Sequence, residues 1–112
     1  NFNTLKSTEN GLMASYSNGL SEVFKNNITP IPPEFEGIVV SRSLQNPNRV
    51  LLGHRDGIAI FEYTNGEWEF FSSIDGVTEQ VYYIQQDHDG IIWAGTEFQG
   101  PKTPYSPAQR SR

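Results

Sequence analysis

The chain has 112 residues, a net charge of −5, 36% hydrophobic residues, 12% aromatic residues and no cysteine. This composition is typical of a folded domain, and it excludes disulfides, thiol catalysis and cysteine metal sites. Residues 1–100 hold all 13 acidic and five basic residues, a charge of 5 − 13 = −8 that argues against nucleic acid as a partner. No apolar run approaches the ~20 residues of a membrane span, so we expect no membrane contact from this segment.

Short apolar runs rich in Val, Ile, Tyr, Phe and Trp alternate with turn dipeptides, a pattern that predicts antiparallel hairpins. The predicted strands, in chain order, are Leu12–Tyr16, Leu20–Phe24, Ile38–Ser43, Val50–His54, Ile58–Tyr63, Trp68–Phe71, Val81–Gln86 and Ile91–Thr96. The predicted turns contain Asn10-Gly11, Asp56-Gly57, Asn65-Gly66, Asp75-Gly76 and Asp89-Gly90, which accept the positive φ of tight turns.

One unit recurs along the chain. The segment around Gly53 matches the one around Gly95 at an offset of 95 − 53 = 42, and Gly19 matches Gly57 at 57 − 19 = 38. A period of this length is typical of a four-stranded propeller blade, and the segments are too rich in strands for helical repeats. The sequence therefore predicts an all-β fold, a β-propeller fragment of about two four-stranded antiparallel blades.

The repeat divides the chain into four parts. Residues 1–36 are expected to be the end of one blade and a connection, 37–75 a near-complete blade, and 76–100 the first half of the next. Residues 101–112 hold three prolines, which exclude a central strand, and they are interpreted as a basic linker or tail. Since closed propellers have about four to eight blades, the expected partner is the rest of the propeller, in the same longer chain or in other copies as a homo-oligomer.

Residues 84–100 carry the most specific pattern, Asp-x-x-Gly-x-x-Trp-x-Gly-Thr, formed by Asp87, Gly90, Trp93, Gly95 and Thr96. These residue types suit a scaffold. Gly90 allows the chain to reverse, and Trp93 offers a large apolar surface for packing between blades. Gly95 permits close strand approach, and the Thr96 hydroxyl can bond across the turn.

This pattern resembles the two-component regulator propeller repeat. The resemblance implies the periplasmic sensor domain of hybrid two-component histidine kinases of Bacteroidetes-like bacteria, many of which recognise oligosaccharides. A non-enzymatic signal-transduction module with an oligosaccharide ligand is therefore the first expectation. Two alternatives stay open: a propeller domain of a carbohydrate-active enzyme, either lyase or hydrolase, and a purely structural or protein-binding propeller.

Candidate ligand-binding residues follow from loop position, because propeller ligands usually lie near the loops that join second and third strands. These loops hold His54 and Arg55 in one blade, and Glu97, Phe98 and Gln99 in the next. An arginine, an aromatic ring and an amide would suit a sugar.

No catalytic, metal-binding or cofactor-binding residue is predicted. The turn around His88 lacks the later oxygen ligands of a calcium loop and is interpreted as a solvated turn. Glu67 and Glu69 share one strand face, which is better explained as a solvated outer strand than as an acid/base pair.

Overall fold

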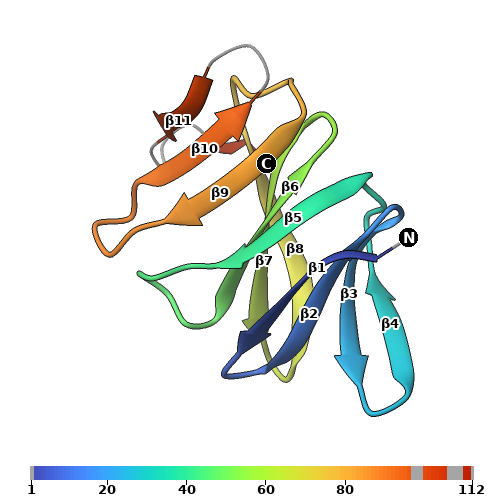
Figure 1. Cartoon of the computed structure of the whole chain (residues 1–112). Helices are drawn as coiled ribbons and strands as arrows, with labels where there is room; N and C mark the ends of the chain where they lie inside the picture. Colours follow the sequence, from blue (N-terminus) through green and yellow to red (C-terminus); the bar gives the residue numbers. More distant parts are fainter. Residues whose placement is uncertain (1, 97–99, 106–109, 112) are drawn as a thin grey trace.

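The computed structural model describes residues 2–96, 100–105 and 110–111, and for residues 2–3, 100–105 and 110–111 only the backbone is considered. The described residues form twelve strands arranged as three antiparallel sheets, here called blades 1 to 3 (Figure 1). None of these residues belongs to a helix long and apolar enough to cross a membrane. The prediction of an all-β, propeller-like fragment is confirmed.

Each blade is a meander in which consecutive strands pair. Blade 1 consists of β1 (Phe2–Thr8), β2 (Gly11–Tyr16), β3 (Gly19–Phe24) and β4 (Asn27–Ile31). Blade 2 consists of β5 (Gly37–Arg42), β6 (Arg49–His54), β7 (Gly57–Thr64) and β8 (Glu67–Ile74), with β12 (Arg110–Ser111) paired to β8. Blade 3 consists of β9 (Val81–Gln86), β10 (Ile92–Thr96) and β11 (Gly100–Tyr105).

The blade boundaries differ from the expected ones at both ends of the chain. Blade 1 is a complete four-stranded sheet, whereas the sequence predicted only the end of a blade before residue 37. Part of the expected tail forms β11 and β12. The prolines of β11 are compatible with a strand because β11 pairs only with β10 and lies at the edge of its sheet.

The same irregularity marks the first strand of every blade. The pairing of first and second strands shifts register between Phe2 and Thr4 in blade 1, between Gly37 and Val39 in blade 2, and opposite Gly95 and Thr96 in blade 3. Such a β-bulge bends the strand and increases its twist. Its recurrence shows that the three blades share one backbone geometry as well as one strand order.

The five predicted turn glycines all have positive φ, among them Gly66 at 85° beside Asn65 at 53°. A pair of positive φ angles is the two-residue hairpin geometry whose twist matches that of the flanking strands. The dipeptides therefore predicted these turns correctly.

Two apolar cores hold the three blades together, and blade 2 belongs to both. Successive side chains along its strands point to opposite faces of the sheet, and therefore to the two cores in turn. Leu51 and Ile60 face blade 3 and join Ile84 and Ile92, whereas Leu52 and Phe61 face blade 1 and join Met13 and Leu20. Blade 2 is thus buried on both faces, as Figure 1 shows by its place between the other two.

Candidate functional site

A hollow of about 360 Å³ opens where blades 1 and 2 meet. It lies at the turns that join second and third strands, β2–β3 in blade 1 and β6–β7 in blade 2, together with the connection between these blades. The lining residues are Ser17, Asn18, Glu34, Phe35, Glu36, His54 and Asp56. Its volume is in the lower part of the range of small-ligand sites.

The connection reaches the hollow by crossing over the first turn at a glycine. A Cβ atom on Gly19 would lie 3.2 Å from the backbone nitrogen of Phe35, so the crossing is close. The arrangement repeats in the next blade, where a Cβ on Gly57 would lie 2.5 Å from the carbonyl oxygen of Val77. Turn and connection therefore form one wall, and the backbone amide of Arg55 donates a 2.9 Å hydrogen bond to the Glu36 carbonyl oxygen.

His54 is the most buried ionisable side chain of the hollow, with 6% of its surface exposed. Its ring lies against Phe35, with the ring centroids 4.4 Å apart. The backbone amide of Asp56 donates a 3.1 Å hydrogen bond to Nδ1 of the imidazole. Burial lowers the pKa of His54 below its usual 6.5, and the smaller, opposite effect comes from the charge of Asp56.

These contacts determine the hydrogen-bonding character of His54. Because Nδ1 accepts the Asp56 amide, the proton of the neutral ring lies on Nε2. Among the described residues, none accepts a hydrogen bond from Nε2. A neutral N–H donor is thus held beside the Phe35 ring at the wall of the hollow.

The charge of the hollow is negative. Glu34, Glu36 and Asp56 all line it. Arg55, the neighbouring cation, is not a lining residue. Its guanidinium lies 3.5 Å from the Glu36 carboxylate in an ion pair whose side chains are both mainly exposed. Such a pair is screened by solvent, so the hollow keeps its acidic character.

We expect the pH dependence of folding to report the burial of His54. The lowered pKa means that the unfolded chain binds more protons than the folded chain near pH 6. The free energy of unfolding should therefore fall as pH is lowered from about 6.5 through the folded-state pKa. Urea titrations from pH 7.5 to 5 measure this, and His54→Gln should flatten the profile. An equal slope in both proteins would contradict the assignment.

The sequence-predicted binding residues separate in the structure. His54 lines the hollow, whereas Arg55 points to Glu36 at its margin. Glu97, Phe98 and Gln99 lie outside the described residues. Sequence reasoning did not find Asn18, although the match of Gly19 to Gly57 places Asn18 at the position of Asp56. Glu34 and Phe35 gave no local signal, because the connection reaches the site only through tertiary packing.

The Asp87 turn of blade 3 is built around its carboxylate. Oδ1 accepts the backbone amides of Asp89 at 2.9 Å and Ile91 at 3.0 Å, and Oδ2 accepts the indole N–H of Trp93 at 2.9 Å. The Trp93 bond is the main cause of a lowered Asp87 pKa. Trp93 was predicted to pack between blades. In the structure it is half-buried and ties its own turn together.

The other motif residues occupy positions consistent with a scaffold. Gly90 has φ +89° where the chain reverses, and a Cβ there would lie 2.6 Å from the Gln45 side chain. Gly95 is buried and pairs with Tyr83 of the adjacent strand. Thr96 is also buried, and its predicted hydroxyl bond stays a prediction.

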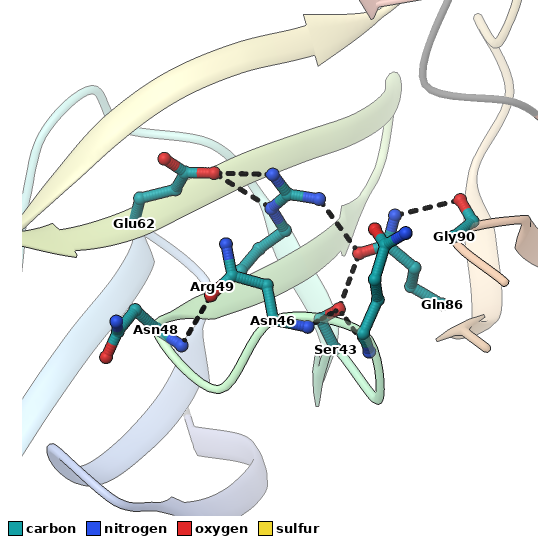
Figure 2. A network of polar contacts seen from close by, with 8 residues as sticks. Ser43, Asn46, Asn48, Arg49, Glu62, Gln86 and Gly90 are labelled. Carbon is teal, nitrogen blue, oxygen red and sulfur yellow. Dashed lines mark hydrogen bonds and ion pairs between the residues drawn. The ribbon is translucent and has the colours of Figure 1, made fainter. Parts of the chain in front are cut away.

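A polar network joins blades 2 and 3 at the start of β6 and the end of β9 (Figure 2). The Arg49 guanidinium donates through two nitrogens to Glu62 Oε2, at 2.9 and 2.7 Å, and through a third to Gln86 Oε1 at 3.1 Å. Ser43 Oγ also donates to Gln86 Oε1, at 2.6 Å, and Gln86 Nε2 donates to the Gly90 carbonyl. Every polar atom of the buried Gln86 side chain is thus satisfied, which indicates a structural joint.

In the described part of the chain, no three His, Asp or Glu side chains lie close enough together to hold a metal ion. The chain matches no family model, no curated protein and no solved structure. The hollow at the β2–β3 and β6–β7 turns is therefore the candidate functional site.

Proposed function

We propose that the chain is part of a ligand-sensing propeller that binds an oligosaccharide without transforming it. The observation that carries this proposal is the hollow at the turns between second and third strands, where propeller ligands usually lie. Its wall combines an aromatic ring, Phe35, with a neutral N–H donor on His54 and an amide on Asn18. A ring that contacts sugar C–H groups and polar groups that bond hydroxyls are the elements of a sugar site.

The charge of the hollow narrows the ligand to a neutral or amine-bearing oligosaccharide. The carboxylates of Glu34, Glu36 and Asp56 would accept hydrogen bonds from hydroxyl or ammonium groups. They would repel the carboxylate of a uronic acid or a sulfate ester. The acidic lining therefore supports a neutral or amine-bearing ligand over an anionic one.

Titration calorimetry with two matched panels tests the proposal. Neutral gluco-, galacto- and manno-oligosaccharides should include a binder, whereas uronic-acid oligomers of equal length should bind at least tenfold more weakly. Asn18→Ala should weaken the neutral ligand about tenfold, the effect of one lost hydrogen bond. Asn26→Ala, an exposed asparagine at the opposite end of blade 1, is the control and should not change affinity.

Three results would contradict the proposal. Binding of no neutral oligosaccharide would remove the ligand class, and equal losses in the Asn18 and Asn26 variants would remove the site. Release of shorter sugars during the titration would favour the carbohydrate-active enzyme instead.

The signalling role belongs to the same proposal and is supported by the resemblance of residues 84–100 to the two-component regulator propeller repeat. In this role the segment lies in the periplasm as part of a histidine-kinase sensor, and sugar binding changes how its blades pack. The adjoining coding sequence tests it. A membrane span followed by a kinase domain is the expected finding, and a catalytic module in their place would overturn the role.

A further inference from the structure

His54 has an unused hydrogen-bond donor at the hollow between blades 1 and 2. The residue is only 6% exposed, and its Nδ1 accepts the Asp56 backbone amide, which leaves the proton of the neutral ring on Nε2. Among the described residues, none accepts a hydrogen bond from Nε2. A buried donor without a partner is costly, so its place in the wall of the hollow indicates an acceptor atom on a ligand.

Acceptor groups lie close to this donor. The Asp56 carboxylate belongs to the same turn and is near enough for its charge to act on the imidazole. Glu34 lines the hollow from the connection between the blades. Neither carboxylate forms an ion pair among the described residues, whereas Glu36 pairs with Arg55. A ligand group that accepts from His54 can therefore also donate to a carboxylate of the same hollow.

The ring of Phe35 adds an apolar surface next to the donor. Its centroid lies 4.4 Å from that of the His54 ring, and the two ring planes are tilted by 33°. Phe35 is only partly buried, and it lines the hollow. A ligand group that touches the ring and the donor together has to combine an apolar part with an acceptor atom.

We propose that the hollow takes an N-acetylhexosamine residue of the oligosaccharide, with its acetamido group directed at His54. The acetamido carbonyl oxygen accepts the Nε2–H hydrogen bond, the acetamido N–H donates to the Asp56 or Glu34 carboxylate, and the methyl group contacts the Phe35 ring. A volume of about 360 Å³, in the lower part of the range of small-ligand sites, suits one sugar residue rather than several.

The acetamido group fits this set of contacts better than the other substituents that a neutral or amine-bearing sugar carries. A hydroxyl group has no methyl for the Phe35 ring. An ammonium group has three donors and no acceptor, so it leaves the His54 Nε2–H group without a partner. This inference rests on the proposed function, because it specifies which sugar the same hollow takes.

Titration calorimetry on the whole chain with three matched disaccharides is the first test. Diacetylchitobiose, cellobiose and deacetylated chitobiose share one linkage and one backbone, and they carry an acetamido, a hydroxyl or an amino group at the same carbon. Diacetylchitobiose should bind about tenfold more tightly than each of the other two, roughly the effect of one hydrogen bond.

Substitutions of His54 should change this preference in opposite ways. His54→Phe keeps a flat ring but has no donor, so diacetylchitobiose should bind no better than cellobiose. His54→Gln should keep most of the preference, because its side-chain amide can donate from near the position of Nε2. His88→Phe is the matched control, since His88 is the other histidine and lies exposed in the Asp87 turn of blade 3. Circular dichroism should be the same for all variants.

Nitrogen-15 NMR of the imidazole tests the hydrogen bond with His54 itself unchanged. The chain has two histidines, so a His88→Phe sample shows the imidazole signals of His54 alone. The free protein should show the proton on Nε2, and saturating diacetylchitobiose should move the Nε2–H proton signal downfield. An Nε2–H signal that does not move when diacetylchitobiose is bound would overturn the inference.

The calorimetry separates failure of this inference from failure of the proposed function. Equal affinities for diacetylchitobiose and cellobiose, or tighter binding of the deacetylated sugar, would overturn the acetamido assignment and leave an oligosaccharide site in place. An undiminished preference in His54→Phe would also overturn it. Binding of no neutral oligosaccharide, these disaccharides included, would overturn both.

Discussion

Phe61→Ala is expected to lower the free energy of unfolding by about 3–5 kcal/mol, the usual cost of truncating a fully buried phenylalanine. Phe61 is completely buried in the core between blades 1 and 2. Its ring meets Phe35 and Phe70 edge-on, with centroids 6.4 and 5.7 Å away. A loss of this size is a large part of the ~5–15 kcal/mol that stabilises a typical domain.

Urea unfolding of Phe61→Ala measures this loss. Phe24→Ala is the matched control, because its ring is 65% exposed and the change should stay within about 0.5 kcal/mol. Similar losses for the two variants would mean that the packing of blades 1 and 2 contributes little to stability.

Gly57→Ala is expected to cost about 2–5 kcal/mol for two separate reasons. Gly57 has φ +145°, a conformation that residues other than glycine rarely adopt. Its added methyl group would also lie 2.5 Å from the Val77 carbonyl oxygen, so the connection to blade 3 would have to move. The substitution should disturb the packing of blade 3 on blade 2 as well as the turn itself.

Gly66→Ala separates these two reasons. Gly66 also has positive φ, +85°, but nothing lies within 4 Å of the position that a Cβ would take. This control should lose only about 1–2 kcal/mol, the cost of backbone strain. Thermal unfolding of both variants gives the comparison, and equal losses would show that the close crossing at Val77 has no energetic weight.

The sequence predicted the strands whose side chains have a strong local pattern and missed those that pairing alone creates. The eight predicted strands each overlap an observed one. The strand β4 contains Pro30 and was missed, because it pairs only with β3 and tolerates proline there. The strand β1 was also missed. Its second half, Lys6, Ser7 and Thr8, is polar, so the pattern of hydrophobic residues did not predict a strand that pairs with β2.

The candidate site was predictable only in part, for a similar reason. His54 was predicted as a ligand-binding residue because the repeat locates the β6–β7 turn in the sequence. The repeat also relates Asn18 to Asp56, so an extension of that comparison would have found a second turn. Burial of His54 against Phe35 depends on where the connection between blades crosses the sheet, and no local sequence pattern describes that crossing.

The double burial of blade 2 has a thermodynamic consequence for the molecule as a whole. Among the described residues, the apolar core of each outer blade is shared with blade 2, so stability is approximately a sum of three intrinsic terms and two nearest-neighbour coupling terms. Loss of blade 1 or blade 3 removes one coupling term, whereas loss of blade 2 removes both. The array should therefore fray from its ends, and the opening that reaches blade 2 should coincide with global unfolding.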